Sequence, residues 1–173
     1  LGVSEGQKLI LHLSNLRPIK RIDVMLNALS QLEDRERFKV VVLAGGSFTP
    51  CQGLVERLGL ADTIVVRESV SVVEDYLQAA DIGVFTSDSE SFCLSVSTRV
   101  GGIPEVVQDG ESALLVPAGN SEAVALALDR LFRDDSLTKR LGEAARDRAL
   151  ERFCPAKIVP EYEALYRRVL AAR

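Results

Sequence analysis

The chain has 173 residues, and 47% of them are hydrophobic, which is enough for a buried core and excludes a disordered or collagen-like chain. The 21 Lys and Arg residues and 25 Asp and Glu residues give a net charge of −4, which argues against general binding to nucleic acids or anionic membranes. No apolar run approaches the roughly 20 residues of a transmembrane segment, and the N-terminus lacks a signal-peptide pattern. Three widely spaced cysteines suit a reducing compartment, so the sequence predicts one cytoplasmic domain over residues 1–173.

The predicted elements alternate between short apolar strands and amphipathic helices, a pattern typical of βαβ units. Strands are predicted at 9–13, 38–43, 63–66, 81–86, 96–98 and 113–116. Helices are predicted at 22–32, 51–58, 71–80, 121–132, 136–153 and 156–170, and Pro104 fits the first turn of another. In the third helix, Ser71 is expected to be the N-cap, with Glu74 completing a capping box. The sequence therefore predicts an α/β fold, a Rossmann-like parallel sheet with helices on both faces and a helical C-terminal third.

The connection between the fourth and fifth predicted strands is short, because only about nine residues, 87–95, separate them. A parallel crossover normally needs roughly a dozen residues or more and usually contains a helix. The chain therefore either makes an unusually tight return at this point or lacks a helix. We favour the second interpretation and expect a missing helix between about residues 95 and 96.

Basic residues follow the first predicted strand. Arg17, Lys20 and Arg21 lie close together on a loop that enters a helix, and Asn15 precedes them. Ligands of open parallel sheets bind at the C-terminal ends of the strands, and the N-terminus of a helix favours an anion. This loop is therefore a candidate diphosphate site. A solvated basic loop that only caps the helix is the alternative interpretation.

Two further loops carry candidate residues. Small polar residues surround Glu90 in the segment 87–94, where backbone amides suit a phosphate and the carboxylate suits sugar hydroxyls. An acidic surface turn explains the same segment equally well. The glycines in 101–105 allow a ligand to approach the backbone closely, although an ordinary loop accounts for them too.

Other chemistries have no motif in this sequence. The only histidine, His12, lies within a predicted strand and is interpreted as a buried residue with one hydrogen-bonded ring nitrogen. A Ser/His/Asp order, HExxH, a P-loop and GxGxxG are all absent, and the sequence has no cluster of metal ligands. Cys93 is the cysteine best placed for chemistry, but no base is predicted beside it.

Six stretches, taken in this order, resemble the family 4 retaining glycosyltransferases: 14–21, 59–62, 80–81, 89–92, 98–105 and 109–110. The resemblance covers essentially the whole chain but only the C-terminal half of such an enzyme, the nucleotide-sugar-binding domain of the GT-B fold. It implies that the N-terminal acceptor domain is absent from this chain. The first and fifth stretches are most similar to the branch that joins N-acetylglucosamine to L-malate.

The resemblance implies roles for individual residues. Lys20 stands at the position of the family's diphosphate-binding lysine, and Glu90 at that of a glutamate that contacts the donor sugar, so both are expected to be catalytic. Asn15 replaces the usual arginine, as in the malate-using branch. Glu68 and Cys93 each stand where a glycine is common. The implied donor-binding set is Asn15, Arg17, Lys20, Arg67, Val70, Glu90, Ser91, Phe92, Cys93 and Leu94.

The implied function is transfer of a hexose or N-acetylhexosamine, expected to be N-acetylglucosamine from UDP-N-acetylglucosamine, to a small acceptor with retention of configuration. The nucleotide sugar is then a co-substrate, and no metal or other cofactor is expected. The chain alone is expected to be inactive without the acceptor domain. The alternatives are a non-catalytic nucleotide- or phosphate-binding module and a nucleotide-sugar epimerase of the same architecture.

Overall fold

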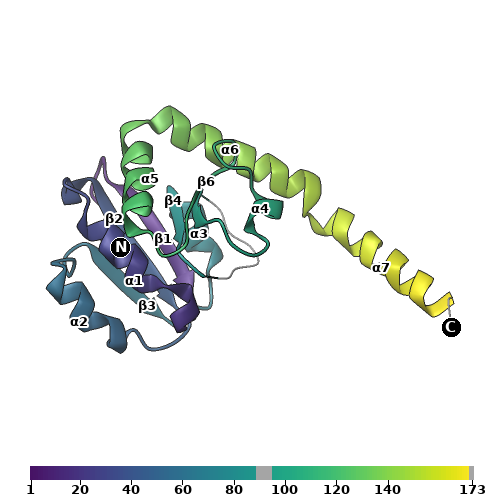
Figure 1. Ribbon diagram of the computed structural model, residues 1–173, viewed down its shortest axis with the longest axis horizontal. Coiled ribbons are helices and arrows are strands. Elements are labelled where there is room, and N and C mark those ends of the chain that lie inside the picture. Colours follow the sequence, from purple (N-terminus) through teal and green to yellow (C-terminus); the bar gives the residue numbers. More distant parts are fainter. Residues whose placement is uncertain (89–94, 172–173) are drawn as a thin grey trace.

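Six parallel strands form one sheet in the part of the chain that the computed structural model describes, residues 1–88 and 95–171 (Figure 1). Their order across the sheet is β3-β2-β1-β4-β5-β6, so the chain builds outward from the centre in both directions. The strands are β1 (Lys8–Ser14), β2 (Phe38–Ala44), β3 (Ile64–Glu68), β4 (Ile82–Phe85), β5 (Ser95–Thr98) and β6 (Ala113–Val116). The predicted Rossmann-like parallel sheet is confirmed.

Every predicted helix is present, with ends that differ by a few residues from the prediction. The helices are α1 (Ile22–Ser30), α2 (Thr49–Arg57), α3 (Glu74–Ala79), α4 (Ile103–Val106), α5 (Ser121–Arg133), α6 (Asp135–Arg152) and α7 (Pro155–Ala171). Two short 3-10 turns, η1 (Pro18–Lys20) and η2 (Arg35–Arg37), were not predicted.

The predicted N-cap of α3 is wrong. The helix begins at Glu74, Val73 occupies the N-cap position, and no side chain caps it, so Ser71 lies in the preceding loop. Val70 and Val73 both pack against an apolar cluster on the sheet. Burial of these two side chains, rather than a capping hydrogen bond, sets where the helix begins.

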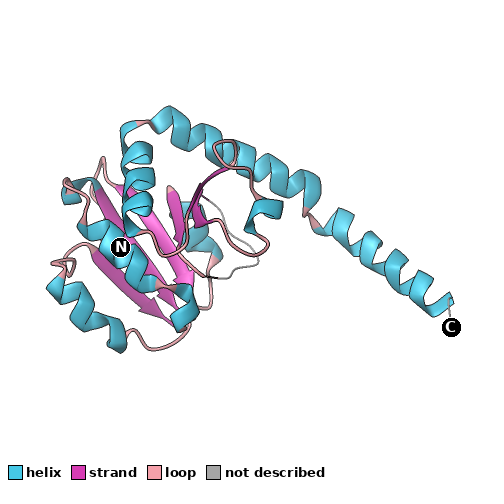
Figure 2. Cartoon of the chain, in the orientation of Figure 1, coloured by secondary structure: helices cyan, strands magenta, loops and turns pink. Residues whose placement is uncertain are grey.

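The two faces of the sheet are covered by different helices (Figure 2). Because successive side chains of a strand point to opposite faces, Ile10 packs with α1 and α5 on one face and Leu11 packs toward α3 on the other. Ile103 of α4 extends the second face beside Phe85. Helices on both faces are therefore confirmed.

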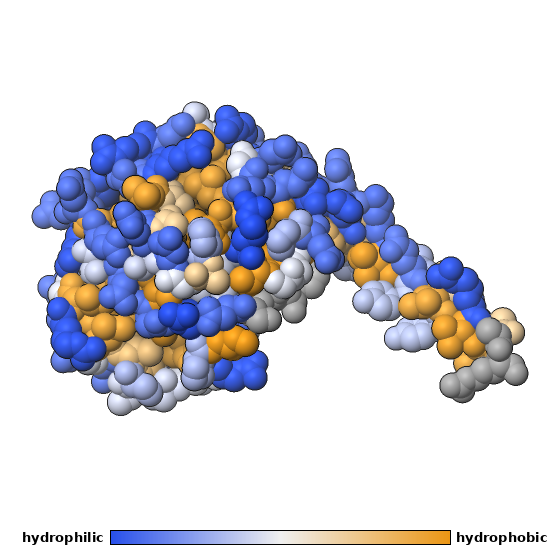
Figure 3. Space-filling view, viewed as in Figure 1, coloured by the Kyte–Doolittle hydropathy of each residue, from blue (hydrophilic) through white to orange (hydrophobic). Residues whose placement is uncertain are grey.

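Helix α7 extends away from the rest of the chain (Figure 1). None of its described side chains is buried, and Figure 3 shows hydrophobic residues along it. The exposed large apolar residues of this helix are Val159, Tyr162, Leu165, Tyr166, Val169 and Leu170. Within residues 1–88 and 95–171, no helix combines the length and the apolar character needed to cross a membrane.

Strands β4 and β5 are direct neighbours in the sheet. Val84 is paired with Val96 and Phe85 with Ser97, in parallel register. Residues 86–94 join the two strands, and 89–94 lie outside the described residues. The helix expected to be missing between about residues 95 and 96 therefore stays a prediction.

Two buried hydroxyl groups on β5 are expected to respond in opposite ways to mutation. Ser97 Oγ has no hydrogen-bond partner among the described residues, whereas Thr98 Oγ1 donates to the carbonyl oxygen of Ser87 at 2.5 Å. An unpaired buried polar group costs about 1–3 kcal/mol. Ser97→Ala should therefore leave the free energy of unfolding unchanged or raise it, and Thr98→Val should lower it by about 1–3 kcal/mol. Urea denaturation measures both, and equal losses in the two variants would contradict this account.

Candidate functional site

The candidate site lies at the C-terminal ends of β1 and β4, the two central strands of the sheet. From β1 the chain continues to β2 and β3 on one side, and β4 begins the other half of the sheet. The loops that follow β1 and β4 meet at this switch point of the strand order. Open parallel sheets bind ligands in a crevice at such a point, and this place is called the crevice below.

A buried histidine anchors the start of the loop after β1. Nδ1 of His12 lies 2.9 Å from the carbonyl oxygen of Val84 in β4, and Nε2 lies 3.0 Å from Oγ of Ser14. A carbonyl oxygen can only accept, so Nδ1 carries the hydrogen. The prediction that only one ring nitrogen is hydrogen-bonded is therefore wrong, because residues 12 and 14 share one face of β1 and β4 lies alongside.

Ser14 links the buried histidine to the loop after β1. Its Oγ accepts a hydrogen bond from the Leu16 backbone N–H at 3.2 Å, and Leu16 adopts a positive φ of 56°. Asn15 Oδ1 accepts from the Arg17 N–H at 3.3 Å, which turns the chain toward η1. The loop after β2 lies close by, since a Cβ on Gly45 would be 3.4 Å from the Asn15 Cα.

The loop after β4 holds the backbone around Lys20. The Asp88 N–H donates to the carbonyl oxygen of Ile19 at 2.9 Å. Thr86 Oγ1 donates to the carbonyl oxygens of Arg21, at 2.8 Å, and of Lys20, at 3.3 Å. Three consecutive carbonyl groups are thus fixed by one neighbouring loop. Lys20 consequently lies at the crevice between β1 and β4.

The structure brings Asn15, Arg17 and Lys20 together on the loop and 3-10 turn after β1, with Asn15 and Arg17 exposed and Lys20 half-buried. The other half of the predicted donor site lies outside the described residues. That half comprises Glu90, Ser91, Phe92, Cys93 and Leu94.

Arg67 and Val70 lie at the same edge of the sheet but at β3, which is separated from β1 by β2. The Arg67 guanidinium donates to the carbonyl oxygen of Val66 at 3.0 Å, and Val70 packs against the sheet. Glu68, in place of a glycine, accepts from the Phe48 N–H at 2.7 Å and so fixes the entry to α2. These contacts hold the group at β3, two strands away from the turn that carries Lys20.

Thr86 and Asp88 are not among the predicted donor-binding residues, although Asp88 lies in the candidate segment 87–94. Both follow β4 directly, and their contacts are to residues about 65 positions earlier in the chain. The sequence did carry a signal for them: each is a polar residue directly after a central strand. Such positions face the crevice of an open parallel sheet.

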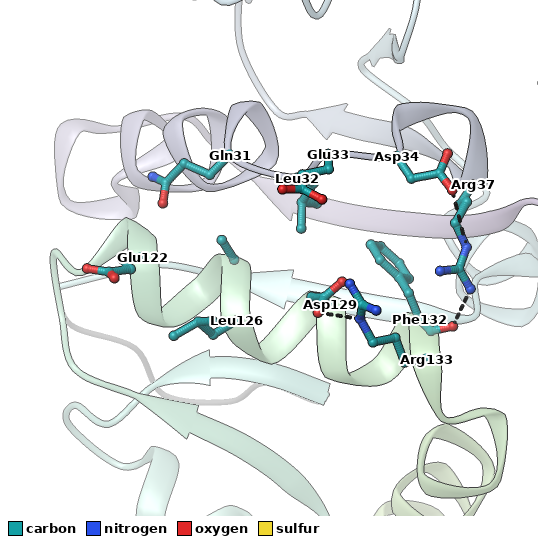
Figure 4. Close-up of a pocket in the computed structure, with 11 residues that line it drawn as sticks. Gln31, Leu32, Glu33, Asp34, Arg37, Glu122, Leu126, Asp129, Phe132 and Arg133 are labelled. Atoms are coloured by element: carbon teal, nitrogen blue, oxygen red, sulfur yellow. Dashed lines mark hydrogen bonds and ion pairs between the residues drawn. The ribbon is translucent and has the colours of Figure 1, made fainter.

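A separate pocket of about 480 Å³ lies between the end of α1 and α5 (Figure 4). Both of its arginines are paired: Arg133 with Asp129 at 2.6 Å, and Arg37 with the Phe132 carbonyl oxygen at 2.7 Å. It lies near the N-terminal end of β2, whereas the candidate site lies at the C-terminal edge. None of the predicted donor-binding residues lines it.

In the described part of the chain, no group of three or more His, Cys, Asp and Glu side chains is arranged to hold a metal ion. The expectation that the reaction needs no cofactor stays a prediction.

The fold defines a Rossmann-like α/β domain, and comparison with known proteins identifies its family. Residues 1–148 match the family described as glycosyl transferases group 1. The chain is 32% identical over 181 residues to N-acetyl-alpha-D-glucosaminyl L-malate synthase of Bacillus anthracis, an alignment that covers 98% of this chain and 48% of that protein. This chain therefore belongs to the group 1 glycosyl transferases.

Solved structures agree with the fold. Sucrose-phosphate synthase from Thermosynechococcus elongatus superposes with a TM-score of 0.88 at 23% identity, over 96% of this chain and 46% of that chain. Anabaena Alr3699/HepE, solved in complex with UDP and glucose, superposes with a TM-score of 0.86 at 20% identity, over 94% and 48%. The chain thus spans about half the length of these relatives.

Proposed function

We propose that this chain is the donor-binding half of a retaining glycosyltransferase and that it binds the diphosphate of UDP-N-acetylglucosamine in the crevice between β1 and β4. The observation that carries the proposal is the position of Lys20 at the end of a 3-10 turn whose carbonyl groups are held by the loop after β4. Further support comes from the family, from the similarity to the malate synthase, and from the neighbour solved with UDP and glucose.

The chemistry assigned to Lys20 is electrostatic. As the sugar leaves, negative charge develops on the diphosphate, and an ammonium group held at that place stabilises it. Asn15 adds an amide that can donate, because its Oδ1 is already the acceptor for Arg17 N–H. Glu90 is proposed to contact sugar hydroxyls, as the family resemblance implies. No protein nucleophile is assigned.

The acceptor is proposed to be a small hydroxy acid such as L-malate, bound by a second domain that this chain does not include. The isolated chain should therefore bind the nucleotide without catalysing transfer. The proposed location is the cytoplasm, where the free thiols of Cys51 and Cys154 would stay reduced.

Calorimetric titration of the 173-residue chain with UDP, UDP-N-acetylglucosamine and inorganic phosphate tests the proposal. We expect saturable binding of both nucleotides, a weaker response to phosphate, and no transfer to L-malate. Absence of UDP binding at millimolar concentration would overturn the proposal. A non-catalytic module would also bind UDP, but it would remain inactive when joined to an acceptor domain from the same family.

A further inference from the structure

Arg21 has a backbone conformation that favours glycine. Its φ is 46° and its ψ is 47°, in the left-handed region, where an L side chain is strained and glycine is not. Arg21 ends η1, since its N–H donates to the Pro18 carbonyl oxygen at 3.1 Å, and it is the N-cap residue of α1. The contacts of the Arg21 side chain therefore have to compensate for this strain.

The guanidinium of Arg21 joins two separate segments. Its Nε and Nη2 contact the carboxylate of Asp23, in the first turn of α1, at 3.1 and 3.0 Å. Its Nη1 lies 3.2 and 3.3 Å from the two carboxylate oxygens of Asp88, in the loop after β4. Hydrogen bonds to Asp23 and Asp88 raise the pKa of Arg21 above its ordinary value, so it stays charged. All three guanidinium nitrogens are thus engaged by protein carboxylates, which disfavours a direct role as an anion ligand.

These contacts reinforce the backbone hydrogen bonds around Lys20. The Arg21 carbonyl oxygen accepts from Thr86, so both the main chain and the side chain of Arg21 are held by the loop after β4. The loop after β6 is also near, since a Cβ on Gly119 would lie 3.7 Å from Arg21 Nη1. Loops from three strands of the sheet therefore meet around this guanidinium.

We propose that Arg21 is a positioning residue for Lys20: by clamping Asp88 across the crevice, it holds the turn that carries Lys20 in the conformation that meets the diphosphate. The inference rests on the proposed function. The side chains of Arg21, Asp23 and Asp88 are 32%, 50% and 43% exposed. Ion pairs this exposed add little to global stability, so their effect is expected in ligand affinity instead.

Arg21→Gly tests the clamp, because glycine accepts the left-handed conformation and the whole Arg21 side chain, guanidinium included, is lost. Calorimetry with UDP on the 173-residue chain should give a dissociation constant five- to tenfold larger than that of the wild type. The midpoint of urea unfolding should change little. Asp88→Ala removes the contact with the loop after β4 and should reproduce most of this loss. Asp23→Ala is the matched control, since it removes a contact local to α1, and it should have the smaller effect.

A double-mutant cycle separates positioning from a structural role. In the Lys20→Ala background, Arg21→Gly should cause no further loss of UDP affinity, because its effect acts through Lys20. The positioning role would be overturned if Arg21→Gly lowered UDP affinity five- to tenfold in both the wild-type and the Lys20→Ala backgrounds. It would also be overturned if Arg21→Gly had no effect in the wild-type background. Either result would leave the proposed function standing. If the wild-type chain binds no UDP, the proposed function fails and the positioning role fails with it.

Discussion

Replacing Lys20 with alanine is expected to weaken UDP binding by roughly tenfold or more. A hydrogen bond to a charged group contributes about 1.5–3 kcal/mol, and about 1.4 kcal/mol corresponds to a factor of ten in affinity. Lys20 sits at the end of a turn whose carbonyl groups are held by Thr86 and Asp88, so the backbone that carries its side chain should need little ordering when the diphosphate binds. Calorimetric titration of the variant with UDP measures the change.

Lys139→Ala provides the control for the change in net charge. Lys139 lies on α6 with its side chain 79% exposed and forms a long ion pair with Glu143, at 3.9 Å. The UDP affinity of this variant should equal that of the wild-type chain. Lys20→Arg should keep part of the affinity because the positive charge remains. Equal affinities for Lys20→Ala and Lys139→Ala would remove Lys20 from the site.

The strands and helices could be predicted because each carries a local pattern of apolar residues. β6 was predicted at 113–116 and lies at Ala113–Val116, and the helix predicted at 121–132 is α5, Ser121–Arg133. In α5 the spacing of apolar side chains separates a buried face from an exposed one, whereas β6 is a short, uninterrupted apolar run. The alternation of strands and helices also predicts a parallel sheet, although it does not determine the order of the strands.

The contacts that shape the candidate site could not be predicted from local patterns. Arg21 and Asp88 lie 67 residues apart, and nothing near either one indicates its partner. The same holds for Glu68, whose carboxylate accepts from Phe48 N–H 20 residues earlier. Such pairs depend on which strands become neighbours and on the exit direction of each loop, and these are properties of the assembled sheet.

The place of Lys20 in the fold could be predicted from the sequence, whereas its role in binding a donor stays a prediction. The position of Lys20 at the crevice follows from a general rule for parallel sheets and did not require knowledge of side-chain contacts. The histidine at the base of the loop shows the limit of that rule. Its second hydrogen bond, to Ser14, requires the pleat of β1, which a composition-based interpretation of a lone histidine did not include.

Phe38→Ala is expected to lower the free energy of unfolding by about 3–5 kcal/mol, because it leaves a cavity the size of a phenyl ring in the core. Phe38 is 1% exposed and stacks on Phe132 of α5, with ring centroids 5.3 Å apart and planes inclined by 9°. Domains of this size are stable by roughly 5–15 kcal/mol, so the loss is a large fraction of the total. Urea denaturation measures it.

The control for Phe38→Ala is Leu126→Ala. Leu126 lines the same pocket as Phe132 but is 66% exposed (Figure 4), so the free energy of unfolding should change by no more than about 0.5 kcal/mol. A loss of several kcal/mol for Leu126→Ala would show that the pocket, rather than the buried stack, determines stability.

The same variant separates stability from ligand binding. Phe38 begins β2, a strand of seven residues whose other end lies at the edge with the candidate site. At about 3.3 Å per residue, roughly 20 Å separates the two ends. Under conditions in which Phe38→Ala remains folded, its UDP affinity should therefore match the wild-type chain. A tenfold loss of UDP affinity in folded Phe38→Ala would mean that packing at the N-terminal edge of the sheet controls the loop that carries Lys20. The conformation of that loop would then not be set by the contacts around the crevice alone.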